Sequence, residues 1–202
     1  MRLYFVRHGQ TDENLKNAYY GRLDVPLNAA GEAQARSVAR LLRFLEPDEI
    51  WMSDLRRVIQ TVDIVCPKIY PKKAFKDFRE MDFGQWEGLT YDEIRQTYPK
   101  DLARWSDDWR MAAPTGGECF DHFFQRVDQT FSGLIRDKGD GKGTVLVAAH
   151  NGTLRIMFAL MLGLDAGGTW HFNFEQDAYS VVDYEYDNFT IRKINSREPV
   201  NV

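Results

Sequence analysis

Cysteine, histidine and long apolar runs are all scarce in this chain of 202 residues. The two cysteines, Cys66 and Cys119, lie far apart and form no Cys-x-x-Cys pair, which excludes the common zinc spacings and a disulfide framework. We expect both thiols to be buried or half-buried. No apolar stretch approaches the 18 residues of a membrane span, and the first residues lack the basic and apolar regions of a signal peptide. The sequence therefore predicts a cytoplasmic protein with no membrane partner.

An excess of positive charge is also absent. Lysine and arginine number 26 against 30 acidic residues, a net charge of −4, which argues against a general nucleic-acid binder. An anionic substrate would need a local cationic pocket in this mildly acidic chain. The length suits one domain with a sizeable core, so we predict a single domain over residues 1–202.

Two similar stretches organise the chain. Near the start, the apolar run Leu3–Val6 leads into Arg7-His8-Gly9, and far downstream Thr144–Ala149 leads into His150-Asn151-Gly152. Each reads as a short buried strand that ends in a histidine on a glycine-bearing turn. Ligands of open α/β sheets bind beyond the carboxyl ends of the strands. If the two strands are neighbours in one parallel sheet, the two imidazoles face each other across a pocket.

Strand and helix patterns alternate along the chain. A helix is expected behind the N-cap Asn28, then a strand at 49–52, with Ser53 as the cap of a following helix that has Arg56 and Arg57 in its first turn. Residues 67–90 show little regular periodicity. Further expected elements are two short helices at 91–98 and 101–111, a longer helix from 118, a helix at 153–162, and a hairpin of 179–186 with 189–194. The pattern predicts an α/β three-layer sandwich, a mostly parallel sheet with helices on both faces.

Five motifs in order resemble the histidine phosphatase superfamily, the group that contains the cofactor-dependent phosphoglycerate mutases. They are Arg7-His8-Gly9-Gln10-Thr11 with Asn14, Ser53–Thr61, Phe78–Gly88, Pro114–Glu118 and Val147–Arg155. The resemblance spans nearly the whole chain and implies the phosphoglycerate mutase-like fold. It also implies a loop and helix insert at about 84–117 that covers the site.

The resemblance implies a phosphohistidine mechanism in which His8 attacks phosphorus. The catalytic positions are His8, Arg7, Arg57, Glu80 and His150. The forked guanidinium groups of Arg7 and Arg57, and His150 if protonated, would stabilise the phosphoryl oxygens. The same cations would keep His8 unprotonated. The candidate substrate-binding residues are Asn14, Gly9, Thr11, Gly21, Asn151 and Gly152.

The proton donor to the leaving group is assigned to a carboxyl group. Glu80 occupies the family's position, and its rival Glu87 is better explained as a structural residue of the Trp-Glu-Gly turn. His122 and His171 lack a strand-end context and are interpreted as structural. No spacing suggests a metal cage, so we expect neither metal nor cofactor.

Three positions depart from the family pattern. Gln10 stands where glutamate is common, Asn151 replaces a frequent glycine, and Cys119 replaces a serine, which weakens a helix cap. None of them touches the five catalytic positions. Catalytic competence is therefore the favoured interpretation.

The length leaves little room for the insert of the mutases, which favours a phosphatase of small phosphorylated metabolites. The segments Tyr20–Leu27 and Pro114–Glu118 look most like the α-ribazole phosphatase branch, which acts in cobalamin synthesis. A mutase, a broad-specificity phosphatase, a phosphoserine phosphatase and a non-catalytic binding module stay open as alternatives. Arg104, Arg110 and the aromatic residues of 86–111 are candidate contacts beyond the phosphate, although a solvated helix face is the favoured interpretation of the two arginines and packing that of the aromatic residues. Either a monomer or a homodimer fits.

Overall fold

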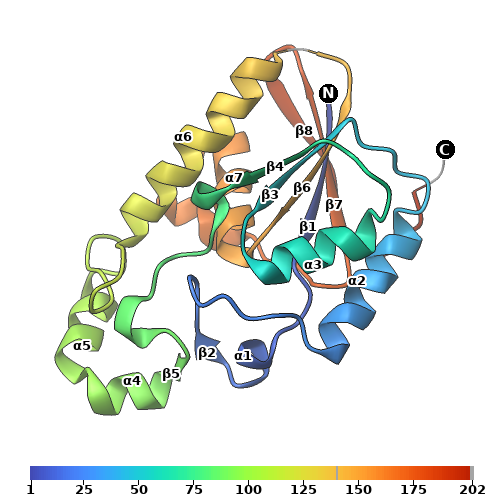
Figure 1. The fold of residues 1–202 in the computed structure, drawn as a ribbon. Helices are drawn as coiled ribbons and strands as arrows, with labels where there is room; N and C mark the ends of the chain where they lie inside the picture. The colour runs from blue at the N-terminus through green and yellow to red at the C-terminus, as the bar shows by residue number, and fades with distance from the viewer. Residues whose placement is uncertain (140, 201–202) are drawn as a thin grey trace.

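The computed structural model describes residues 1–139 and 141–200. Residue 140 and residues 201–202, which belong to the predicted domain 1–202, lie outside the described residues. Six strands form one sheet with four parallel strands and two antiparallel ones at one edge (Figure 1). In spatial order they are β4 (Lys72–Phe75), β3 (Glu49–Ser53), β6 (Thr144–Ala149), β1 (Arg2–Arg7), β7 (Tyr179–Glu185) and β8 (Asn188–Ser196).

Helices cover both faces of this sheet, as the sequence predicts. Helices α2 (Ala29–Leu41) and α3 (Arg56–Val65) lie on one side, and α6 (Phe120–Lys138) and α7 (Asn151–Met161) on the other (Figure 1). The remaining elements are shorter. They are α1 (Asp12–Leu15), β2 (Ala18–Tyr19), η1 (Lys76–Phe78), η2 (Gly84–Trp86), β5 (Leu89–Thr90), α4 (Tyr91–Thr97), α5 (Pro99–Asp107) and η3 (Ala166–His171). Strand β5 pairs with β2, so the 84–117 segment lies against the loop that follows β1.

Successive side chains of β1 enter two different cores, because side chains alternate across a strand. Leu3 and Phe5 pack in the cluster of α6 and α7, whereas Tyr4 and Val6 pack in the cluster of α2 and α3. Burial of one such side chain contributes about 1.5–3 kcal/mol. The strand is therefore held from both faces, and the loop at its carboxyl end begins from a fixed point.

Three sequence-based expectations need correction. Ser53 does not cap a helix: it ends β3, and α3 follows Leu55 without a side-chain cap. Residues 67–90 contain the edge strand β4. Its side chains are mostly exposed and include Lys72 and Lys73, so no apolar run marks the strand in the sequence. Helix α7 starts at Asn151, two residues before the predicted start.

Other expectations are confirmed. Asn28 caps α2 through a hydrogen bond from Gly31 N. Cys119 is the N-cap of α6 and makes no side-chain cap bond, as its replacement of serine predicts. Both cysteines are buried free thiols. Within residues 1–139 and 141–200, no helix is long and apolar enough to cross a membrane.

We predict that Gly31→Ala destabilises the protein although alanine is the better helix former. A Cβ at Gly31 would lie 2.1 Å from Gln10 O, a backbone atom of the loop that carries His8. Overpacking of this kind costs about 1–3 kcal/mol. Urea unfolding measures the change in the free energy of unfolding.

The matched control is Gly133→Ala in α6, where the new Cβ meets only Arg136 Nη2, at 3.9 Å. This variant should gain up to about 1 kcal/mol from helix propensity. A stabilised Gly31→Ala variant would contradict the close approach.

Candidate active site

The carboxyl ends of three parallel strands converge on two histidines. Strands β1 and β6 pair with Arg7 opposite Ala149, so His8 and His150 follow at the same level, and His8 N donates to Ala149 O. The two imidazole rings lie 5.0 Å apart between centroids in an edge-to-face arrangement. The structure therefore places the two histidines as the sequence predicts.

The hydrogen bonds of His8 define its tautomer. Its Nδ1 lies 2.8 Å from Gly9 O, and a carbonyl only accepts, so Nδ1 carries the proton. Burial, with Arg57 and Arg7 nearby, holds the pKa of His8 well below its usual value. The ring is thus neutral, and Nε2 keeps a free lone pair. That is the state required of a nucleophile.

His150 is also neutral, and both of its nitrogens are engaged within the protein. Arg57 Nε donates to His150 Nδ1 at 3.2 Å, and His150 Nε2 lies 2.9 Å from Ser53 Oγ. Burial and the neighbouring Arg57 hold its pKa well below the usual value. The sequence interpretation gave His150 a charge only if it is protonated, and that condition is not met here. In the structure, His150 instead accepts a hydrogen bond from Arg57 and so holds its guanidinium group.

Two guanidinium groups, from the fully buried Arg57 and the half-buried Arg7, supply the positive charge. Arg57 is fully buried and donates to Gly21 O and Leu23 O at 2.8 Å, and Arg7 Nη1 donates to Phe174 O at 2.8 Å. In the part of the chain that the structure describes, no carboxylate lies within 4.0 Å of either group. Burial lowers the pKa of both groups. Buried charges are ordinarily paired, so this pair is suited to an anion.

Glu80 faces this cationic pair from the loop after η1. Its Oε2 accepts from Gly152 N at 2.8 Å, and Oε1 accepts from Met81 N at 3.1 Å. A Cβ at position 152 would lie 2.3 Å from Oε1, so only glycine leaves room for this carboxylate. The first turn of α7 therefore holds Glu80 in place.

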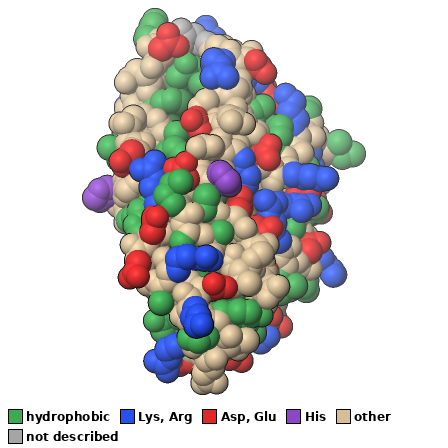
Figure 2. All heavy atoms as spheres, turned by 90° about the vertical axis from the view of Figure 1, so that its left-hand side faces the viewer, with side chains coloured by type: hydrophobic (Ala, Val, Ile, Leu, Met, Phe, Trp, Pro, Cys, Tyr) green, Lys and Arg blue, Asp and Glu red, His purple; other side chains and the backbone are tan. Residues whose placement is uncertain are grey.

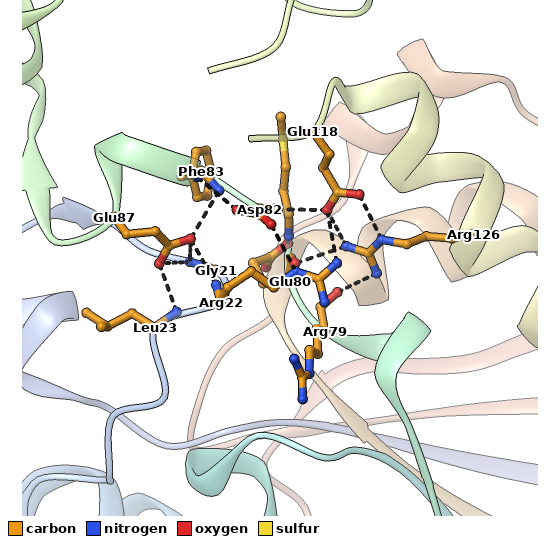
Figure 3. A network of polar contacts seen from close by, with 12 residues as sticks. Gly21, Arg22, Leu23, Arg79, Glu80, Asp82, Phe83, Glu87, Glu118 and Arg126 are labelled. Atoms are coloured by element: carbon orange, nitrogen blue, oxygen red, sulfur yellow. Dashed lines mark hydrogen bonds and ion pairs between the residues drawn. The ribbon is translucent and has the colours of Figure 1, made fainter. Parts of the chain in front are cut away.

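Glu87, the rival acid, has a structural environment. Its carboxylate accepts from the backbone N–H groups of Gly21, Arg22, Leu23 and Phe83, at 2.9–3.0 Å. Figure 3 shows it on the other side of Glu80 from Glu118. It joins the turn after β2 to the 83–87 segment, and both of its oxygens are occupied.

The remaining predicted binding residues surround this centre. Thr11 caps α1 and its hydroxyl donates to Tyr20 Oη, and Asn14 Oδ1 accepts from Thr11 N and Gln176 Nε2. Gly9 N donates to Thr61 Oγ1. Asn151 Oδ1 accepts from Phe174 N, the residue whose carbonyl holds Arg7.

A cavity of about 610 Å³ extends from these residues. Asn14, Glu80, Asn151 and Gly152 are among the residues that line it. The wall also contains aromatic side chains from several elements: Tyr19, Tyr20, Phe83, Tyr91, Trp105, Trp109, Phe120, Phe123 and Trp170. Arg155 contributes the cation of this wall and lies over the Trp170 ring.

Two arginines suggested as contacts beyond the phosphate lie elsewhere. Arg104 pairs with Asp101 and Arg110 with Asp121, and neither lines the cavity. Acidic and basic side chains are interspersed over the face that contains α6 and the 84–117 segment (Figure 2). Positive charge is therefore not concentrated on this surface as it is at Arg7 and Arg57.

Sequence reasoning missed Ser53 as a partner of His150, and it missed Arg155 and Trp170. Tyr20 belongs to the Tyr20–Leu27 segment but had no predicted role of its own. In the structure the Arg57 guanidinium lies over its ring, 4.8 Å from the centroid. Trp170 is distant in sequence from every motif, so no local pattern could have found it.

Comparisons with known proteins agree with this geometry. Residues 3–197 match the histidine phosphatase superfamily (branch 1). The "Adenosylcobalamin/alpha-ribazole phosphatase" of Escherichia coli (strain K12) is 33% identical over 98% of this chain and 97% of its own. "Phosphoserine phosphatase 1" of Hydrogenobacter thermophilus is 30% identical over 96% and 92%. The crystal structure of the alpha-ribazole phosphatase from Shigella flexneri superposes with a TM-score of 0.94 at 31% identity, covering 100% of both chains.

We predict that stability falls as the pH is lowered below about 6.5. The unfolded chain binds a proton at each of His8 and His150 there, whereas the folded protein, with both pKa values well lowered, does not. Unfolding then takes up protons, at up to about 1.4 kcal/mol per pH unit for each histidine. Urea unfolding at pH 7.5, 6.5 and 5.5 measures this.

His8→Gln should remove one of the two contributions, whereas His171→Gln, at an exposed position, should keep the wild-type dependence. Equal wild-type stability at pH 5.5 and 7.5 would refute neutral burial of the pair.

Proposed function

The chain belongs to branch 1 of the histidine phosphatase superfamily and is a phosphatase, and from this premise we propose that its substrate is α-ribazole 5′-phosphate. Relatives and a solved structure that carry the α-ribazole name match it over essentially the full chain. A nucleotide of this kind has a phosphate at one end and an aromatic base at the other. The observation that carries the proposal is the aromatic cavity that opens beside the phosphate-binding residues.

The chemistry begins at His8. Its Nε2 lone pair attacks phosphorus, and the bond between phosphorus and the leaving oxygen breaks. Protonated Glu80 gives its proton to that oxygen, so the alcohol leaves neutral. A water molecule then gives a proton to the Glu80 carboxylate as its oxygen attacks phosphorus, and the phosphorus–nitrogen bond returns its electron pair to His8. One ester and one water become one alcohol and one phosphate.

The cations stabilise the charge on the phosphoryl oxygens. Phosphoryl transfer depends mostly on positioning and electrostatic stabilisation. Arg7 and Arg57 hold the non-bridging oxygens with their remaining N–H donors, and the Asn14 amide adds a hydrogen bond. His150 holds Arg57 by the Nε–Nδ1 hydrogen bond described above.

The other binding residues act through the backbone and through neighbours. Asn151 fixes the peptide of Phe174 and with it Arg7. Thr11 fixes Asn14 and Tyr20, and the carbonyl of Gly21 fixes Arg57. Gly9 allows the close approach of the Gly31 backbone in α2, and Gly152 leaves room for Glu80.

The 84–117 segment recognises the rest of the substrate in this proposal. Tyr91, Trp105 and Trp109 come from it and line the cavity. Stacking of a base on an aromatic side chain contributes about 1–3 kcal/mol. A short alkyl phosphate would leave this wall unused.

Phosphoserine is a second candidate, favoured by Arg155. This guanidinium lines the cavity, its Nε is buried without a hydrogen-bond partner, and its Nη2 donates to Asn173 Oδ1 at 3.2 Å. Among the described residues no carboxylate lies within 4.0 Å of it. A substrate carboxylate would complete its coordination.

Phosphate release from a panel of esters tests the assignment. The panel contains α-ribazole 5′-phosphate, phosphoserine, 3-phosphoglycerate and sugar phosphates, with His8→Ala as the inactive control. We expect α-ribazole 5′-phosphate to lead by at least ~100-fold in kcat/KM, about 2.7 kcal/mol of transition-state discrimination. A flat profile would indicate a broad-specificity phosphatase, and isomerisation of 3-phosphoglycerate without release would indicate a mutase.

Trp170→Ala tests the aromatic wall. This side chain is 55% exposed, so its removal should cost little stability. We expect KM for α-ribazole 5′-phosphate to rise about tenfold, within the range of one stacking contact, while KM for a short alkyl phosphate stays unchanged. The control Phe44→Ala removes an exposed aromatic residue that does not line the cavity. An equal rise for both esters would refute stacking.

A further inference from the structure

Arg126 of α6 ends on the backbone of the segment that leads to Glu80. Its Nη1 donates to Asp77 O at 2.7 Å and to Arg79 O at 2.9 Å, and its Nη2 donates to Glu80 O at 3.0 Å. Figure 3 shows the guanidinium beside Arg79 and Glu80. Three carbonyls within four residues thus accept from one side chain.

Glu118 completes the coordination of Arg126. Its Oε2 accepts from Arg126 Nε at 2.9 Å and its Oε1 from Nη2 at 2.5 Å. Both side chains are largely buried, with 15% and 16% exposed. Burial raises the pKa of Glu118, but the hydrogen bonds and charge of Arg126, the Asp82 N–H group and the charge of Arg22 together outweigh it, so the pKa is lowered and the pair is ionic. Oε1 also accepts from Asp82 N at 2.7 Å, which extends the contact past Glu80.

All five N–H donors of Arg126 are therefore used. An arginine carries five donors in a fixed planar fork, and here two go to Glu118 and three to the backbone. A lysine carries three donors on a single atom and cannot reproduce this arrangement. The site is specific for arginine.

The segment 77–80 needs such support because it lacks a strand partner. It leaves a single turn of 3-10 helix and continues as a loop. From the α7 side, Thr153 Oγ1 bonds weakly to Phe78 O and Arg79 O, at 3.2 and 3.3 Å. Arg126 holds the same segment from α6 with shorter, charge-assisted bonds.

We propose that Arg126, held by Glu118, is a positioning residue that sets the place of Glu80 relative to the leaving oxygen. The proposal rests on the proposed function, in which Glu80 gives the proton. Arg126 itself touches neither the substrate nor the reacting atoms. Its loss lets the 77–80 segment shift, and a displacement near 1 Å at a reacting group costs about 100-fold in rate.

The consequence depends on the leaving group. An alkyl alcohol is a strong base as the anion and needs the proton of Glu80, whereas 4-nitrophenolate is a weak base and leaves without it. Misplacement of Glu80 should therefore slow alkyl esters selectively. General loss of folded protein would slow both esters equally, so the ratio of the two rates is independent of the folded fraction.

The experiment compares kcat on α-ribazole 5′-phosphate, or the best alkyl ester of the panel, with kcat on 4-nitrophenyl phosphate. We expect Arg126→Gln to lower the first by about 10- to 100-fold and the second by less than about threefold, with KM little changed. Arg126→Lys should show the same pattern. The control Arg2→Gln removes a two-bond arginine–carboxylate pair at the other end of the sheet and should leave the ratio unchanged.

Glu80→Gln separates the two proposals. If Glu80→Gln slows both esters equally, the proton-donor role of Glu80 fails. Suppose that Glu80→Gln slows the alkyl ester selectively. If Arg126→Gln and Arg126→Lys then keep the wild-type ratio of the two rates, the positioning role of Arg126 is overturned. Glu118→Gln should give a milder selective loss, and it carries the test if the Arg126 variants do not fold.

Discussion

Two guanidinium groups that have no carboxylate partner among residues 1–139 and 141–200 are the constraint on which the rest of the site depends. Arg7 and Arg57 lose hydration on burial and recover only part of it from carbonyl groups and from His150. Such a cost is tolerated only when the surrounding structure is rigid. The sheet gives that rigidity, because the in-register pairing of β1 with β6 fixes the start of both histidine loops. Burial, together with the same charge, keeps the pKa of both imidazoles low and both rings neutral.

Carboxylates organise the loops around this centre without neutralising it. Glu87 binds the backbone of the turn at 21–23, and Glu118 binds Arg126 and Asp82 N. Both therefore hold backbone and do not pair with the guanidinium groups of Arg7 and Arg57. Each oxygen bound to N–H groups also replaces a hydrogen bond that a loop would otherwise make to water. The loops thus reach a defined conformation with little regular secondary structure.

Much of the fold and of the centre was predictable from sequence, for physical reasons that differ between elements. Fully buried strands leave a strong apolar signal, so β1, β6 and the two histidines were foreseen together. The prediction that Ser53 caps a helix is wrong. A serine before a helix is a local signal for a cap, and here a tertiary contact with His150 overrides it. Edge strand β4 lacks an apolar pattern because it is exposed. The aromatic wall joins Trp109 to Trp170 at 5.4 Å, and a contact between such distant positions leaves no local periodicity. Arg126 binds carbonyl groups, which every residue carries, so its target has no sequence signature.

In the proposed mechanism, the charge of Arg7 and Arg57 also links turnover to its own product. A centre built to hold phosphoryl oxygens also holds inorganic phosphate, which is released at the end of every cycle. Any dianion of that shape binds the folded chain and not the unfolded one, and so stabilises the fold by mass action. Phosphate buffers would therefore make this protein more resistant to heat and slower at the same time.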